Sequence, residues 1–192
     1  MAIVVIWASP DKEGLTASAK NNAIEGIHKA GREVKEIHLN QKKIQSCLAC
    51  GKGGYVKCLE KGNCILNDDF DSIYTALCQA ETIVFITPVY WHDLSENFKA
   101  LFDRLRRCET AHNGFLKEKR YLAVACAGGY GLGVTDCLVH METTLSHMGM
   151  KALDRIPVVR FNQAYMIPAI REAAYSLALF HNEFSFDDFK FS

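Results

Sequence analysis

The stretch that decides the fold is residues 3–16, which read IVVIWASPDKEGLT. Five apolar residues, Ile3 to Trp7, have the length and composition of a strand buried on both faces. A loop containing Ser, Pro and Gly follows, and from Thr16 to Ala30 small and apolar residues recur at helical spacing. Gly31 stands where the C-terminal cap of a helix belongs. These residues therefore predict a strand, a short loop and a helix.

The same alternation continues along the chain. Further strands are predicted at residues 34–39, 82–86, 121–126 and 156–159, and further helices from Asp68, Ser95, Val134 and Pro168. Repeated strand–helix units imply parallel strands joined by right-handed crossovers. We therefore predict an α/β fold with three layers, helix–sheet–helix, around a five-stranded parallel sheet in the order 2-1-3-4-5.

Composition limits the possible classes of protein. The chain has 192 residues, is 49% hydrophobic, and carries 22 basic and 22 acidic side chains. It suits one domain over residues 1–192, with a cysteine-containing loop at 40–67 and an aromatic tail at 182–192 that would dock on a partner subunit or fray. Balanced charge argues against nucleic acid as a partner, and the longest apolar runs are too short to span a membrane. With no basic leader at the N-terminus, we expect a soluble, cytoplasmic protein.

Three loops are expected to meet at the carboxyl edge of the sheet, where such folds bind ligands. They are Ser9 to Thr16, Pro88 to Ser95, and Ala127 to Gly133. The first is either an ordinary turn or a phosphate site, because a helix N-terminus offers free N–H groups to an anion. The aromatic residues of the second either line a crevice or only cover the sheet. The glycines of the third form either a flexible turn or a surface that a flat ring can approach closely.

Motifs in these loops resemble a known family. Ser9-Pro10 with Gly14-Leu15-Thr16, Cys47-Leu48-Ala49-Cys50 with Cys64 and Asp68-Asp69, and Thr87-Pro88-Val89-Tyr90-Trp91 with Asp103-Arg104 are similar to motifs of the NADPH-dependent FMN reductase family. Within that family the chain looks most like the iron–sulfur flavoprotein branch. The resemblance implies a flavodoxin-like fold, bound FMN, NAD(P)H as co-substrate, and a homodimer or homotetramer.

The resemblance also implies site residues. Those that would hold the FMN phosphate are Ser9, Pro10, Leu15 and Thr16, with Lys12 offsetting an acidic Asp11 where the family usually has a basic residue. Those that would line the ribityl chain and ring are Pro88, Val89, Tyr90 and Trp91, with Gly128 and Gly129 at the edge of the ring. His92 either contacts flavin or substrate or is a polar loop residue. No catalytic side chain is implied, because the flavin carries the chemistry.

Four cysteines form a separate candidate site. Cys47, Cys50, Cys58 and Cys64 are spaced C-x2-C-x7-C-x5-C, whereas family members with a [4Fe-4S] cluster look like C-x2-C-x2-C-x4–7-C. The expected third position is Gly53. Cys58 as a replacement ligand would allow a cluster or a zinc ion. We favour free or redox-active thiols without metal, because spacing is what makes such motifs diagnostic.

We expect this segment to lie beside the flavin site or at a subunit interface. The remaining cysteines, Cys78, Cys108, Cys126 and Cys137, are interpreted as small buried hydrophobic residues. Arg104, Arg106 and Arg107 are expected to complement the dipole at a helix end.

The favoured function is an oxidoreductase that passes electrons from NAD(P)H through FMN to a small-molecule or protein acceptor. One alternative is an iron–sulfur flavoprotein or a flavodoxin-like electron carrier without its own substrate turnover. Another is a thiol-rich binding protein that has kept the fold and lost the flavin.

Overall fold

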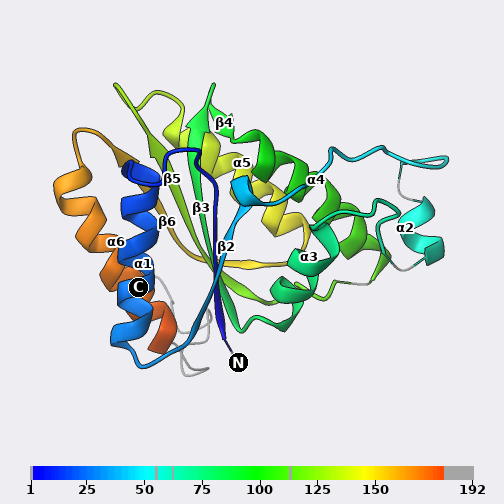
Figure 1. Ribbon diagram of the computed structural model, residues 1–192, viewed down its shortest axis with the longest axis horizontal. Coiled ribbons are helices and arrows are strands. Elements are labelled where there is room, and N and C mark those ends of the chain that lie inside the picture. Colours follow the sequence, from blue (N-terminus) through cyan, green and yellow to red (C-terminus); the bar gives the residue numbers. More distant parts are fainter. Residues whose placement is uncertain (1, 55, 62, 113, 180–192) are drawn as a thin grey trace, which may run out of the picture.

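A computed structural model describes residues 2–54, 56–61, 63–112 and 114–179 (Figure 1). The elements in chain order are β1 (Ile3–Trp7), α1 (Leu15–Lys29), β2 (Val34–His38), η1 (Leu39–Gln41), α2 (Val56–Lys61), α3 (Phe70–Gln79), β3 (Thr82–Tyr90), β4 (Asp93–Leu94), α4 (Glu96–Ala111), β5 (Arg120–Ala127), α5 (Val134–His147), β6 (Lys151–Val159) and α6 (Gln163–Leu179). Five parallel strands follow the order β2-β1-β3-β5-β6, and β4 pairs antiparallel with the end of β3. The predicted three-layer fold and its strand order 2-1-3-4-5 are confirmed.

The sheet is buried on both faces. Helices α1 and α6 cover one face, and α3, α4 and α5 cover the other (Figure 1). Because side chains alternate along a strand, Val4 and Ile6 of β1 join the core under α3 to α5, while Val5 joins the core under α1 and α6. Helix α1 packs closely on α6, since a Cβ at Gly26 would lie 2.1 Å from the carbonyl oxygen of Arg171. A side chain there would push the two helices apart.

Three element boundaries differ clearly from those predicted. Strand β6 begins at Lys151, five residues before the predicted strand at 156–159. Strand β3 does not stop before Pro88 but continues to Tyr90, because Val89 and Tyr90 pair with β4 in a short hairpin. The last helix starts at Gln163, so Pro168 lies inside α6 rather than at its first turn.

Two other expectations concern the chain as a whole. Among the described residues, every helix is too short or too polar to span a lipid bilayer. The tail at residues 182–192 lies outside the described residues.

Candidate functional site

The three predicted loops meet at the carboxyl edge of the sheet. The N–H of Ala8 donates to the carbonyl of Ile86 at 3.1 Å, which joins the ends of β1 and β3. The Thr16 side chain, at the start of α1, acts to lower the pKa of the Cys126 thiol at the end of β5, so the two side chains lie close together. The loops after β3 and β5 also touch, since a Cβ at Gly133 would lie 2.5 Å from the Cα of His92. Residues far apart in the sequence therefore share one edge of the fold.

The first loop presents a helix N-terminus together with two hydroxyl groups. Ser9 and Thr16 are both buried, at the end of β1 and in the first turn of α1. Gly14 is the N-cap residue, and among the described residues no side chain caps α1 by a hydrogen bond. The first turn also carries no acidic residue. The free N–H groups and the positive end of the helix dipole suit a phosphate group.

Asp11 does not suit a phosphate in its present position. Its carboxylate accepts a hydrogen bond from the N–H of Glu13 at 2.8 Å, and its Oδ2 would lie 2.5 Å from a Cβ at Gly14. The acid thus lies over the start of α1, whereas Lys12 is exposed. A dianion bound here requires the Asp11 side chain to turn away, because two like charges at close range repel strongly.

The second loop reverses the chain through a strained turn. Trp91 and His92 have φ values of 50° and 68°, a backbone region that costs energy for residues other than glycine. His92 Nδ1 lies 2.7 Å from the Asp136 carboxylate of α5, which fixes the turn. Pro88 is buried, Tyr90 is partly exposed, and Trp91 is 98% exposed at the tip. Local sequence does not predict this strain, since neither residue is Gly or Asn.

The third loop offers open backbone. A Cβ added at Gly128 or Gly129 would meet nothing within 4 Å, so free space lies beside both residues. Tyr130, which follows them, is fully exposed. This is the surface that a flat ring needs to approach a backbone without clashing.

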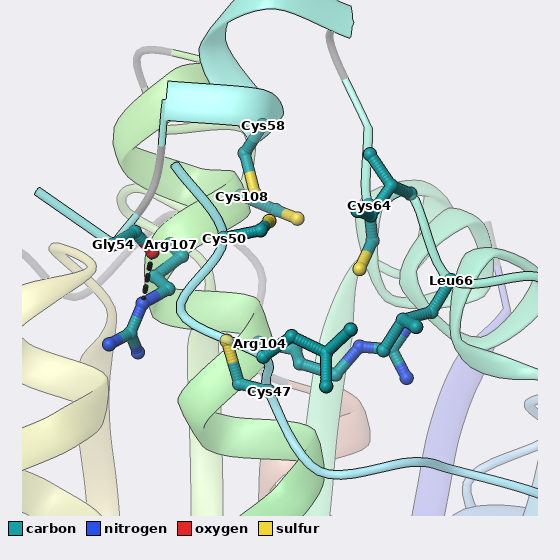
Figure 2. A pocket seen from close by; sticks show the side chains of 11 residues that line it. Cys47, Cys50, Gly54, Cys58, Cys64, Leu66, Arg104, Arg107 and Cys108 are labelled. Carbon is teal, nitrogen blue, oxygen red and sulfur yellow. Dashed lines mark hydrogen bonds between the residues drawn. The ribbon is translucent and has the colours of Figure 1, made fainter. Parts of the chain in front are cut away.

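The cysteine segment forms a second site against α4. Cys47, Cys50, Cys58 and Cys64 line one pocket together with a fifth cysteine, Cys108 (Figure 2). From the sequence, Cys108 is interpreted as a small buried hydrophobic residue apart from the other four. It is indeed buried, but α4 presents it to the other four thiols. Spacing along the chain cannot reveal this contact, because Cys108 lies on a separate element.

Two arginines of α4 hold the cysteine segment in place. Arg104 is fully buried and binds the Asp68 carboxylate with two hydrogen bonds, of 2.6 and 2.9 Å, and the carbonyl of Gln45 at 3.2 Å. Arg107 Nε donates to the carbonyl of Gly54 at 2.8 Å. The expectation that Arg104 complements a helix end is wrong, because it lies in the middle of α4 and ties both ends of the segment to the core.

The thiols within the pocket influence one another. Burial raises the pKa of the Cys58 thiol, and a hydrogen bond with Cys108 opposes this shift. Burial also raises the pKa of Cys108, so this residue stays a neutral thiol at ordinary pH. The described residues contain no group of three or more His, Cys, Asp or Glu that is arranged to hold a single metal ion. The five thiols line one pocket without forming such a group.

The pocket lies away from the three loops of the same chain. Helix α4 begins beside the second loop, and the pocket is lined by its residues 104 and 108. At 1.5 Å per residue, these positions are roughly 14 to 20 Å along the helix axis from Ser95. Figure 1 likewise shows α2 at the far right of the view and the loops at the upper edge of the sheet. We expected the cysteine segment either beside the flavin site or at a subunit interface. Within one chain, the pocket is not beside the three loops. Its location at a subunit interface stays a prediction.

Comparison with known proteins identifies the family. Residues 1–163 match the family model described as NADPH-dependent FMN reductase. The chain belongs to this family. The resemblance drawn from the motifs is thereby confirmed, and membership implies FMN as cofactor and a nicotinamide as co-substrate.

Several curated relatives of this FMN reductase family member carry iron–sulfur names. An iron–sulfur flavoprotein of Methanosarcina thermophila is 31% identical over 153 residues, 78% of this chain and 75% of the relative. One from Archaeoglobus fulgidus is 29% identical over 131 residues, 68% of this chain and 56% of the relative. The chain spans only about half to three-fifths of the length of several such relatives.

Solved structures share the fold. An NAD(P)H:quinone oxidoreductase from Methanothermobacter marburgensis superposes with a TM-score of 0.67 at 17% identity, covering 95% of this chain and 99% of that one. A flavone reductase superposes with a TM-score of 0.69 at 19% identity, covering 93% of this chain and 62% of that one. At such identities the likeness shows the flavodoxin-like architecture alone.

Proposed function

We propose that this protein is an FMN-dependent oxidoreductase that takes electrons from NAD(P)H and passes them to a small-molecule or protein acceptor. The observation that carries the proposal is the meeting of three loops, with a free helix N-terminus in one and open glycine backbone in another, in a chain of the FMN reductase family. The chemistry that FMN supplies when bound is acceptance of hydride from a nicotinamide and onward transfer of one or two electrons.

The first loop would hold the phosphate. The hydroxyls of Ser9 and Thr16 and the first N–H groups of α1 are the donors, and the helix dipole favours the negative charge. The Thr16 hydroxyl would donate to the phosphate, and Asp11 would turn outward. Lys12, which is exposed, would then supply a compensating positive charge.

The second and third loops would hold the ring between them. Pro88, Val89, Tyr90 and Trp91 form one wall, while Gly128 and Gly129 leave room at the ring edge. The contact between His92 and Asp136 links the second loop to α5, the helix that follows the third loop. The residues themselves orient the cofactor and exclude water, and no side-chain acid or base is assigned.

A second subunit would complete this edge. Trp91, Tyr130 and Phe161 are between 88% and 100% exposed, and all three follow strand ends at the same edge of the sheet. Clustered exposed aromatic residues are typical of protein interfaces. We therefore propose a homodimer or homotetramer whose flavin edge is covered by a partner subunit.

A second candidate function adds a metal centre. We propose that the cysteine pocket takes an iron–sulfur cluster bound by Cys47, Cys50, Cys58 and Cys64, so that the protein moves electrons between two centres. The five gathered thiols favour this reading over a flavin-only enzyme, and the names of the curated relatives support it.

The test begins with protein purified without oxygen. Heat release followed by chromatography should give one FMN per chain, and anaerobic addition of NADPH or NADH should bleach the visible flavin absorption. Protein that is folded but neither contains nor takes up FMN would contradict the central proposal. Flavin that binds but is not reduced by either nicotinamide would indicate the electron carrier instead.

A further inference from the structure

One face of α4 looks into the cysteine pocket. Arg104 and Cys108 are four residues apart, so they lie above one another on the same side of the helix. Both line the pocket (Figure 2), and each is only 1% exposed to solvent. Neither residue belongs to the cysteine segment itself.

One N–H group of Arg104 makes no hydrogen bond among the described residues. Its two terminal nitrogens bind Asp68 and Gln45, but its Nε–H is buried and has no hydrogen-bond partner among the described residues. A buried N–H without a partner costs roughly 1–3 kcal/mol, and more on a charged group. This donor borders the pocket at the side of Cys64, whose thiol interacts with the guanidinium.

Cys108 makes its contact with one particular thiol. It lines the pocket with Cys58, the cysteine that replaces the missing third position at Gly53, and the two thiols influence each other's pKa. Cys58 lies on α2, a helix of only six residues within the cysteine segment. A contact from the long helix α4 therefore fixes a thiol that the short helix alone would hold loosely.

We propose that α4 supplies the outer hydrogen bonds of the metal centre: Cys108 donates its S–H to the Cys58 sulfur, and Arg104 donates its Nε–H to the sulfur atoms that face it. Both are positioning residues and not ligands. This inference rests on the second proposed function, the binding of a cluster by the four thiols.

Such donors change a measurable property of the centre. Hydrogen bonds to the sulfur atoms stabilise the more negative, reduced form, so they raise the reduction potential. The positive charge of Arg104 acts in the same direction. Removing either donor should lower the potential without removing the metal.

The experiment uses the full chain, reconstituted with ferrous iron and sulfide without oxygen. Iron, acid-labile sulfide and FMN are measured per chain, and the midpoint potential is followed by electron paramagnetic resonance. Cys108→Ala should keep its iron and sulfide and shift the potential to more negative values. Cys108→Ser, which retains a donor, should recover most of that shift. Arg104→Lys, which keeps a cation near Asp68 but lacks Nε–H, should also shift it negatively.

Two controls frame these results. Cys137→Ala removes a buried thiol of α5 outside the pocket and should change nothing, whereas Cys58→Ala should lose most of the iron. A Cys108→Ala protein with the parent potential and spectrum would overturn the inference. So would a folded Cys108→Ala protein without iron, since Cys108 would then be a ligand.

The parent protein separates this inference from the proposal about flavin. If the parent binds FMN but takes up no iron, the role of α4 is refuted while the flavin proposal stands. If it takes up iron but no FMN, the flavin proposal is refuted while the proposal about α4 stands.

Discussion

Arg104 of α4 and Asp68, the residue two positions before α3, form a buried ion pair joined by two hydrogen bonds. The Asp68 side chain is 3% exposed and that of Arg104 is fully buried. Asp68 also accepts hydrogen bonds from the N–H groups of Gln45 and Phe70, so its charge is fully compensated. The guanidinium stacks over the ring of Phe70 at 4.1 Å. One carboxylate thus joins the cysteine segment, the start of α3 and the middle of α4.

Removing the charge of Asp68 should destabilise the fold. In Asp68→Asn the buried Arg104 charge loses its hydrogen-bonded carboxylate partner, and breaking such a pair typically costs about 3–5 kcal/mol. Urea unfolding followed by circular dichroism measures the loss. The control is Asp103→Asn, which breaks an exposed pair with Lys99 on the same helix and should cost under about 1 kcal/mol. Equal losses in the two variants would show that burial of the pair contributes nothing.

The same pair makes stability depend on pH. Burial acts to raise the pKa of Asp68, but the hydrogen bonds from Arg104 and the backbone outweigh it and hold that pKa below its usual value. The stabilisation is therefore complete above the unfolded pKa of about 3.9 and is lost as pH falls through the lower, folded pKa. Below about pH 4, the free energy of unfolding should fall more steeply in the parent than in Asp68→Asn, by up to about 1.4 kcal/mol per pH unit. Parallel pH curves for the two proteins would refute this assignment.

Neutralising Asp11 should tighten FMN binding. Asp11→Asn keeps an oxygen that can accept from the N–H of Glu13, but it removes a negative charge from the start of α1. Because the phosphate is a dianion, we expect the FMN dissociation constant to fall at least about tenfold. Flavin fluorescence quenching gives the constants, and Glu13→Gln, an exposed neighbour, should have a smaller effect. An unchanged constant in Asp11→Asn would place the phosphate away from this helix terminus.

Removing the two buried hydroxyls of the first loop should have the opposite effect. Each hydrogen bond to a charged group contributes roughly 1.5–3 kcal/mol, so Ser9→Ala with Thr16→Val should weaken FMN binding at least tenfold. Thr75→Val, at an exposed hydroxyl on α3, is the matched control and should bind like the parent. Full affinity in the double variant, with its fold intact, would exclude both hydroxyls from the phosphate site.

The sequence predicts the sheet well because strands buried on both faces consist of uninterrupted apolar residues. The five residues of β1 are all buried, and an uninterrupted apolar run is the expected signature of such a strand. The carboxyl edge follows from strand order, which is why the three loops were placed together correctly. The strained turn at Trp91 and His92 is not predicted, because neither residue type favours a positive φ, and its contact with α5 joins residues 44 positions apart.

The cysteine pocket shows the opposite limit. Spacing identified four thiols, but Cys108 and Arg104 join them only through the packing of α4 against the segment. Arg104 looks like any surface arginine of an amphipathic helix until its distant partner, Asp68, is known. Contacts between elements far apart in sequence decide the chemistry of this site, and no local pattern encodes them.

Two glycines of the third loop separate a structural role from a binding role. Gly133 has a φ of 79°, and a Cβ there would lie 2.5 Å from the backbone of His92, so Gly133→Ala should destabilise the fold by at least about 1 kcal/mol. Gly128 has free space around it, so Gly128→Ala should leave the melting temperature unchanged. If the flavin ring lies against this backbone, however, the added methyl group occupies its place, and the FMN dissociation constant should rise several-fold. Thermal unfolding without flavin and fluorescence titration with FMN measure the two effects independently. A Gly128→Ala protein with the affinity of the parent would show that the ring does not reach the third loop.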